Sequence, residues 1–325
     1  MSRPDVSVVI PTYNRREMVQ RAIESCFAGN EDIKIEVIVV DDGSTDGTRD
    51  YLKSIDDSRV HPIFQEHQGA QVARNAGQDD AQGHAIKHLD DDDYLCPDGL
   101  QRQYELLWDA GVDATYGDVY VIDDRNNDGR RSIRHFGKTD TLFSGLTSET
   151  IDRVQWAYLF RREIVEPVRW DESLDFLQDF AFMHEVASQH VTLKKVIGKP
   201  IAVHHAHAGV RVTDARNQAD RGARYNFKCE CVLEATQALV NSAATEAQAY
   251  QYCIQGARGI WKEIHKIAPF DFELFQKWYT EIQFLAPQFV PQRPNKLLAI
   301  SDRLMSPKTT ERMINPVRKW KASLR

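Results

Sequence analysis

The sequence contains no hydrophobic run long enough to cross a membrane. A membrane-spanning helix needs about 20 consecutive apolar residues, and no stretch of the 325 residues approaches that length. The N-terminal residues also lack the basic, apolar and small-residue order of a signal peptide. We therefore expect a cytoplasmic location.

Cysteine is scarce, and positive charge is not in excess. The five cysteines are odd in number and scattered, so neither a disulfide framework nor a zinc site is expected. Asp and Glu number 48 against 41 Lys and Arg, which gives a formal net charge of -7. General nucleic-acid binding requires Lys and Arg to neutralise phosphates, so we expect no nucleic-acid partner.

Glycine-rich phosphate loops are also missing. A dinucleotide-binding fold would carry G-x-G-x-x-G after its first strand, and a P-loop would end in Lys-Ser/Thr. Neither pattern occurs at the end of the first expected strand. A nucleotidyltransferase would likewise need a glycine-rich N-terminal loop with Arg and Lys, so that class is only an alternative here.

The first hundred residues alternate short β-branched runs with helical patterns. This alternation predicts right-handed crossovers and an α/β fold with a mostly parallel sheet flanked by helices. The expected strands are residues 6–10, 35–40, 60–64 and 85–89, with helices at 15–28, 48–55 and 69–81.

The remainder of the chain is less regular, and then helical. Between residues 97 and 212 we expect helices at 97–110 and 179–189, strands at 114–116, 119–122, 191–196 and 201–203, and a turn-rich loop at 123–131. From about residue 216 the composition shifts to Ala, Gln, Glu and Lys at helical spacing. We predict a domain over 1–215, with halves 1–100 and 101–215, and a helical C-terminal region over 216–325.

Four adjacent aspartates, Asp90 to Asp93, follow the strand expected at 85–89. Four carboxylates at a partly buried strand end repel one another unless a cation compensates them. A divalent cation with oxygen ligands, Mg²⁺ or Mn²⁺, is the natural partner. The alternative is an exposed acidic turn that caps the next helix.

Two other strand ends also carry polar signals. Tyr13 offers a ring on which a nucleobase can stack, and Asp41 can accept a hydrogen bond from a base N–H or a ribose hydroxyl. Because parallel strands bring their carboxyl ends to one edge, we expect these residues to lie near the aspartates. The alternative for the first strand end is a simple turn in which Asn14 caps a helix.

Four segments together resemble the family 2 inverting glycosyltransferases of the GT-A fold. They are Ser7-Val8-Val9-Ile10-Pro11-Thr12-Tyr13-Asn14-Arg15, Val39-Val40-Asp41-Asp42-Gly43-Ser44-Thr45-Asp46-Gly47-Thr48, Ala73-Arg74-Asn75-Ala76-Gly77 and Leu89-Asp90-Asp91-Asp92-Asp93. The resemblance covers about residues 5–100 and continues more weakly to about 212. It implies a nucleotide-sugar donor, with UDP favoured, a Mn²⁺ or Mg²⁺ cofactor, and inverting transfer to a carbohydrate or lipid-linked carbohydrate acceptor in polysaccharide or glycoconjugate synthesis.

The resemblance also implies roles for individual residues. Asp92 is expected to ligate the metal together with His207, although His204, His205 and His207 form a cluster that could equally be a surface turn. The residues expected to bind the nucleotide sugar are Pro11, Thr12, Tyr13, Arg15, Asp41, Arg74, Asp90, Asp91 and Arg211.

On the acceptor side the resemblance points to Asp179 as the general base. In the family the base follows a glutamate and lies downstream of a Gly-Gly-Phe-Asp-Glu-like segment. Here Trp170-Asp171-Glu172-Ser173-Leu174 lacks the glycines, and Gln178 replaces the glutamate. Asp179 could instead cap a helix. A noncatalytic sugar-nucleotide-binding protein is therefore the other class of function.

The last 25 residues are basic, with seven Lys and Arg against two acidic residues, and apolar residues are interleaved with them. This pattern fits an amphipathic segment that makes peripheral contact with the inner face of a membrane. It fits a solvated terminal helix equally well.

Overall fold

A computed structural model describes residues 3–124, 129–207, 221–268, 271–291 and 306–311. The chain forms two compact units. The first comprises Met1–Leu142, Thr150–Val186 and Val191–Asp214, and the second comprises Phe143–Glu149, Ala187–His190 and Ala215–Arg325. Among the described helices, none combines the length and apolar character needed to cross a membrane.

A seven-stranded sheet, in the order β10-β6-β9-β4-β1-β2-β3, is the centre of the first unit. The strands are β1 (Val6–Thr12), β2 (Ile35–Asp42), β3 (Val60–Gln65), β4 (Ala85–His88), β6 (Ala114–Gly117), β9 (Tyr158–Arg161) and β10 (Leu193–Val196). Only β9 runs antiparallel to its neighbours. The predicted mostly parallel α/β fold is confirmed.

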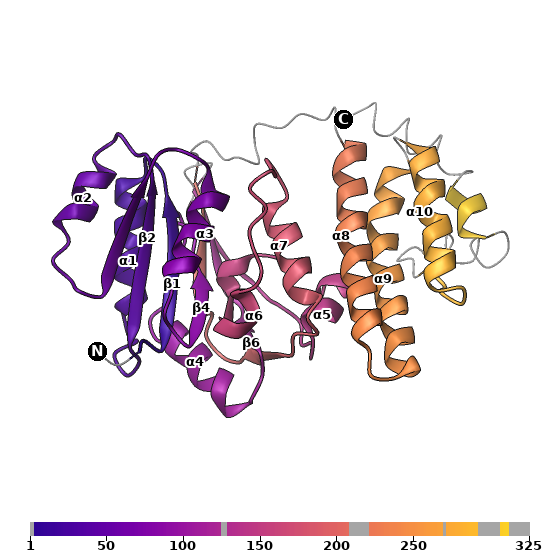
Figure 1. Cartoon of the computed structure of the whole chain (residues 1–325), viewed down its shortest axis with the longest axis horizontal. Helices are drawn as coiled ribbons and strands as arrows, with labels where there is room; N and C mark the ends of the chain where they lie inside the picture. The colour runs from indigo at the N-terminus through magenta and orange to yellow at the C-terminus, as the bar shows by residue number, and fades with distance from the viewer. Residues whose placement is uncertain (1–2, 125–128, 208–220, 269–270, 292–305, 312–325) are drawn as a thin grey trace. The chain divides into compact units, whose positions relative to one another are not determined.

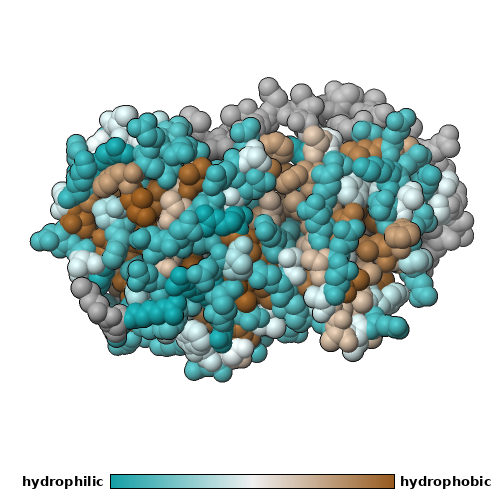
Figure 2. All heavy atoms as spheres, in the orientation of Figure 1, coloured by the Kyte–Doolittle hydropathy of each residue, from teal (hydrophilic) through white to brown (hydrophobic). Residues whose placement is uncertain are grey.

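Helices flank this sheet (Figure 1). They are α1 (Arg16–Phe27), α2 (Thr48–Ser54), α3 (Ala70–Asp80), α4 (Gly99–Asp109), α6 (Arg162–Val165) and α7 (Gln178–Ala187), with a 3-10 turn η1 (Gln155–Ala157). Every residue of β1 and β2 is buried, as expected for Val- and Ile-rich strands covered on both faces. Hydrophilic residues cover most of the visible surface, with hydrophobic residues between them (Figure 2).

Helix α3 packs very closely against β1 and β2. A Cβ atom at Gly77 would lie 2.5 Å from Val9 Cγ1 and 3.1 Å from Val40 Cγ2. Only a glycine permits this approach, which fixes the height of α3 over the strand ends.

A smaller four-stranded sheet, in the order β5-β11-β7-β8, completes the first unit. Its strands are β5 (Tyr94–Leu95), β7 (Val119–Asp123), β8 (Arg130–Arg134) and β11 (Ala202–Ala206). The prediction of a loop over residues 123–131 was wrong for its last two residues, because β8 begins at Arg130 and pairs antiparallel with β7. Its sequence Arg-Arg-Ser-Ile-Arg has no apolar run, so pairing with β7, and not its own pattern, makes it a strand.

The second unit contains the helices α5 (Leu142–Ser148), α8 (Arg221–Ser242), α9 (Glu246–Ile267) and α10 (Phe272–Leu285). Helical structure was expected over much of this range from its composition. Thr245 and Asp271 cap α9 and α10 by accepting hydrogen bonds from Gln248 N and Leu274 N. Of the basic terminal segment only residues 306–311 are described, so the predicted amphipathic segment lies outside the described residues.

The substitution Gly77→Ala tests the close packing of α3. An added methyl group at this site overpacks the contact with Val9 and should cost about 1–3 kcal/mol of unfolding free energy. Gly222→Ala in α8 is the control, since nothing lies within 4 Å of its added Cβ. Chemical denaturation measures both variants, and equal stabilities would contradict the packing argument.

Candidate active site

The ends of β1 and β4 meet at one edge of the large sheet. Thr12, the last residue of β1, donates a hydrogen bond from Oγ1 to Asp91 Oδ2 at 2.8 Å. Asp91 follows β4, which pairs in parallel with β1. The predicted convergence of these strand ends is therefore confirmed.

Asp91 is a buried structural carboxylate of this edge. Only 4% of it is exposed, and burial raises its pKa to about 6 although the charge of Arg15 opposes the shift. Arg15 Nη1 donates to Asp91 Oδ1 at 2.8 Å and to Asp92 Oδ2 at 3.1 Å. With Thr12 and Arg15 each bound to one oxygen, Asp91 is partly neutralised by the protein itself.

The other three aspartates form a group that could hold a metal ion. Asp90, Asp92 and Asp93 each present an oxygen within 4.8 Å of the others. Three carboxylate oxygens so placed suit Mg²⁺ or Mn²⁺, which bind hard oxygen ligands. Burial also raises the pKa of Asp93 to about 6, so its ionised form needs a nearby cation. The donor set therefore fits a divalent metal.

The alternative of an acidic capping turn does not fit the structure. The N-cap residue of α4 is Asp98, which lies beyond the cluster. Asp93 leads directly into β5, and both Asp91 and Asp93 are buried.

Strand β11 brings histidines to the cluster. Nδ1 of His204 lies 3.1 Å from Asp93 Oδ1, and the backbone N–H of His205 donates to the same oxygen at 2.8 Å. His207 Nε2 lies 3.1 Å from Asp92 Oδ2. His204 and His205 are strand residues, so the surface-turn alternative is wrong for them.

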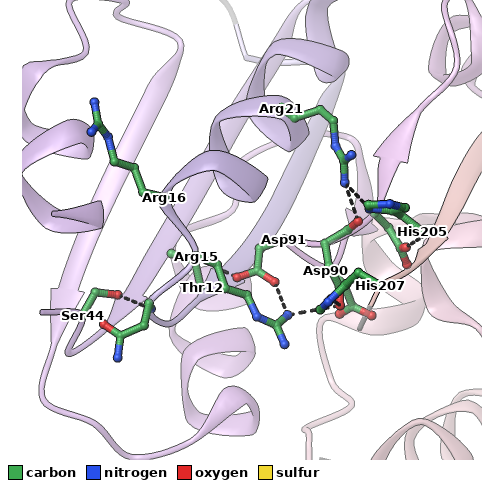
Figure 3. A network of polar contacts seen from close by, with 12 residues as sticks. Thr12, Arg15, Arg16, Arg21, Ser44, Asp90, Asp91, His205 and His207 are labelled. Carbon is green, nitrogen blue, oxygen red and sulfur yellow. Dashed lines mark hydrogen bonds and ion pairs between the residues drawn. The ribbon is translucent and has the colours of Figure 1, made fainter. Parts of the chain in front are cut away.

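Arg21 of α1 links β11 to the aspartates. Its Nη2 donates to the backbone oxygen of Asp92 at 2.8 Å and lies 3.0 Å from His205 Nδ1. Figure 3 shows Arg15, Arg21 and His207 directed toward this cluster. Arginines of α1 and its N-cap, and histidines of β11 and the residue after it, therefore surround the acidic strand end.

An aromatic pair lies at the ends of β1 and β3. Tyr13 is 42% exposed, and its ring stacks on His67 with the centroids 4.1 Å apart. Nδ1 of His67 lies 2.8 Å from Asp42 Oδ2. The outer face of this stack is a flat surface of the kind on which a nucleobase can stack.

Asp41 does not present an open carboxylate. Its side chain is fully buried, and Arg49 Nε donates to Oδ2 at 2.9 Å. Asn14 does not cap α1, because Arg15 occupies the N-cap position. Asn14 instead adopts a positive φ of 53° and accepts a hydrogen bond from Thr45 N, which joins the ends of β1 and β2.

Asp90 and Asp179 lie around the guanidinium of Arg74. Arg74 Nη2 donates to Asp90 Oδ1 at 2.7 Å, and Gln155 Nε2 donates to both Asp90 oxygens at 3.1 Å. Burial raises the pKa of Asp179 to about 6, while the charge of Arg74 lowers it and that of Asp90 raises it. Asp179 in the first turn of α7 is thus close enough to the cluster to interact with its charges.

Helix α3 also holds the segment that precedes Asp179. Asn75 Nδ2 donates to the Trp170 oxygen at 2.9 Å, and Trp170 N donates to Asn75 Oδ1 at 2.9 Å. The side chain of Gln71 donates to the backbone oxygen of Leu174. Arg74 stacks over the Trp170 ring at 4.5 Å. One helix therefore positions both Arg74 and the chain that leads to α7.

Most of the predicted site residues lie in this region, whereas Arg211 lies outside the described residues. Pro11 is buried in β1 beside Val40. The site residues that sequence reasoning did not single out are Arg21, Arg49, His67, Asn75 and Gln155. Asn75 stands inside a motif quoted above, so that motif held a signal for it. Arg21 and Gln155 stand in no motif.

Curated relatives include three bacterial proteins. Succinoglycan biosynthesis protein ExoO of Rhizobium meliloti is 34% identical over 195 residues, 55% of each chain. The GalNAc(5)-diNAcBac-PP-undecaprenol beta-1,3-glucosyltransferase of Campylobacter jejuni is 28% identical over 180 residues, 52% of this chain and 55% of the relative. The UDP-Glc:alpha-D-GlcNAc-diphosphoundecaprenol beta-1,3-glucosyltransferase WfaP of Escherichia coli is 33% identical over 120 residues, 37% and 47%. The chain spans about half the length of these relatives.

A solved structure and a family model complete the comparison. The S. aureus TarS 1-349 crystal structure in complex with UDP-GlcNAc has a TM-score of 0.63 and 16% identity, and the match covers 87% of this chain and 90% of that one. This similarity shows a shared fold. The Glycosyl transferase family 2 model matches residues 7–169, which is half of the chain and includes both strand ends and the aspartate cluster. The protein belongs to glycosyl transferase family 2.

Proposed function

We propose that the protein transfers a sugar from a UDP-sugar to the hydroxyl group of a carbohydrate acceptor, with inversion at the anomeric carbon. The observation that carries this proposal is the grouping of three carboxylate oxygens beside the Arg74 and Asp179 side chains. Names of relatives support the donor and the setting, since two are glucosyltransferases that act on diphosphoundecaprenol-linked sugars. We place the reaction in polysaccharide or glycoconjugate synthesis.

The donor would bind along the ends of β1, β2 and β4. The base would stack on the outer face of the Tyr13–His67 pair. Arg49 would face the base, with Asp41 behind as the partner of the guanidinium. Asp90, Asp92 and Asp93 would hold Mn²⁺ or Mg²⁺, with His207 beside Asp92.

Several side chains at this edge of the sheet would stabilise the negative charge on the leaving diphosphate. A bound divalent metal stabilises negative charge on such a leaving group. Arg15 contacts Asp91 and Asp92, and Arg74 contacts Asp90. Both guanidinium groups could therefore turn their donors toward the diphosphate oxygens without leaving the site.

Asp179 would act as the general base. An inverting transfer requires a carboxylate that takes the proton from the acceptor hydroxyl as its oxygen attacks the anomeric carbon. A carboxyl with a pKa of about 6 is ionised at neutral pH and is a stronger base than an ordinary aspartate. The proton would end on an Asp179 oxygen, next to the Arg74 guanidinium.

A noncatalytic sugar-nucleotide-binding protein is the second candidate. Gln178 favours it, because its amide donates to the Leu174 oxygen at 3.2 Å where the family has a glutamate. A panel of UDP- and GDP-sugars with Mn²⁺, assayed by thermal shift and then by nucleotide release, separates the two. If donors bind but no sugar is transferred and no donor is even slowly hydrolysed, the binding protein is favoured over an enzyme.

Asp92→Asn tests the metal site. Loss of one carboxylate charge should weaken Mn²⁺-dependent UDP binding by at least about tenfold, since hard cations depend on ligand charge. Calorimetric titration measures the affinity with and without Mn²⁺. Asp109→Asn, at the exposed end of α4, is the matched control and should bind UDP as the wild type does. Unchanged metal-dependent binding in Asp92→Asn would refute the assignment.

Asp179→Asn tests the general base. We expect the transfer rate to fall by about 10²–10⁴-fold, the usual contribution of a positioned base, while UDP–Mn²⁺ affinity stays within a factor of about two. Asp171→Asn, an exposed residue of the preceding turn, is the control. Asp179→Asn with full turnover would remove Asp179 as the base.

The pH dependence of kcat/KM tests the same residue. Because the base must be ionised and burial raises its pKa to about 6, activity should be constant above that pH and fall as pH decreases through it. Asp91 and Asp93 also have raised pKa values, so UDP–Mn²⁺ affinity is measured over the same range. An acid limb that merely follows donor affinity would show that Asp179 does not cause it.

A further inference from the structure

Among the described residues, one apolar face of the small sheet of the first unit is exposed. A cavity of about 540 Å³ lies on this face. All four strands line it with apolar side chains, among them Tyr94, Tyr120, Ile122, Ile133 and Val203. We call this cavity the small-sheet groove. Nothing in the proposed mechanism uses it.

Strand register arranges the apolar residues in a row across the sheet. Val203 pairs with Tyr94 on one side and with Tyr120 on the other, and Tyr120 pairs with Ile133. Directly paired residues point to the same face of a sheet. Tyr120 and Ile133 are 38% and 42% exposed, and a contiguous exposed apolar surface of this kind marks an interaction site.

The next row on the same face is charged and polar. Two residues along each strand, His205 pairs with Ile122, and Ile122 pairs with Arg131. Arg131 is exposed, and His205 Nε2 lies 2.6 Å from Asp124 Oδ2. Along the direction of β11 this face therefore changes from an apolar row to one that carries the charge of Arg131 and the His205–Asp124 pair.

This second row is the one nearer the aspartate cluster. His205 Nδ1 contacts Arg21, which donates to the backbone oxygen of Asp92. His207, two residues beyond His205, contacts the Asp92 side chain. An elongated ligand lying along β11 would thus pass from apolar side chains to Arg131 and His205 and then to the carboxylates.

We propose that the small-sheet groove binds the hydrocarbon chain of a lipid-linked acceptor, with the phosphate of that lipid at Arg131 and its sugar toward the aspartate cluster. The role as acceptor site rests on the proposed function. A hydrocarbon chain suits the groove because it needs no hydrogen bonds. A sugar in the same place would bury hydroxyl groups against Ile, Leu and Val without partners.

Charge argues against a second copy of the chain as the occupant. Arg131 is the arginine of the edge strand β8 that lies on the groove face, and it is exposed. Two copies packed through this face would both place Arg131 in the contact, and like charges placed opposite each other destabilise a contact. An anionic amphiphile satisfies both the apolar row and Arg131.

The test measures binding of farnesyl phosphate, farnesol and inorganic phosphate to the full chain by calorimetry. Mn²⁺ and saturating UDP are present, so that the donor site is occupied. Farnesyl phosphate should bind, and the other two should bind at least about tenfold more weakly, because each offers only half of the recognised chemistry. Equal binding of farnesyl phosphate and inorganic phosphate would overturn the proposal that the groove binds a hydrocarbon chain.

Substitutions localise the binding. Ile133→Glu and Arg131→Glu should each weaken farnesyl phosphate binding at least about tenfold. Ile197→Glu and Lys194→Glu, exposed apolar and basic residues near the end of β10, should bind within about twofold of the wild type. UDP–Mn²⁺ affinity, unchanged in all four variants, shows that each variant is folded. Wild-type affinity in both groove variants would overturn the proposal.

Two further results separate this proposal from the proposed function. A wild type that binds farnesyl phosphate through Ile133 and Arg131 but binds no UDP-sugar supports the lipid-phosphate groove and contradicts the proposed function. A wild type that transfers sugar to a soluble acceptor without binding farnesyl phosphate overturns the groove alone. Sedimentation that shows a wild-type dimer dissociated by Ile133→Glu also overturns it, because the face would then be a contact between copies.

Discussion

The cost of placing ionised carboxylates at a buried strand end governs the architecture around this site. Asp91 and Asp93 are almost completely buried, and burial raises the pKa of both. Their charged forms persist only where cations lie close. Arg15 at the start of α1 and Arg74 in α3 are such cations, and His204 of β11 contacts Asp93. Polar contacts therefore tie each of these elements to the residues that follow β4.

Helix α3 connects the aspartates to a second segment of the first unit. Gly77 lets the helix lie against Val9 and Val40, which brings Arg74 down to Asp90. The same helix uses Asn75 and Gln78 to bind backbone groups of residues 165–170. A segment far away in sequence is thereby held beside the aspartates, and α7 with Asp179 follows it. Helix α3 therefore positions residues on both the donor side and the acceptor side of the proposed reaction.

The small sheet has two different faces, and each has its own use. His204 points to the face where it stacks on Trp156 and contacts Asp93. Val203 and His205 lie on the opposite face, which carries the small-sheet groove. Alternation along a single strand therefore lets β11 contribute to the aspartate cluster and, as we propose, to acceptor binding.

Much of the first hundred residues was readable from the sequence because the signals there are local. A Val- and Ile-rich strand buried on both faces, such as β1 or β2, has a pattern that few other structures share. Parallel strand order then places Thr12 and the aspartates at one edge, which the Thr12–Asp91 hydrogen bond confirms. The family resemblance rested on these same segments, and the family match includes them.

Other features depend on contacts between residues far apart in the chain. Strand β8 has no apolar pattern and exists because it pairs with β7. The Tyr13–His67 pair joins the segments that follow β1 and β3, which meet only in the folded sheet. The sequence by itself determined the fold class, the family and the acidic strand end, since these depend on local pattern and strand order. Only the tertiary structure decided which oxygens of Asp90 to Asp93 are already bound, and that one face of the small sheet is open, because burial and pairing are properties of distant residues brought together.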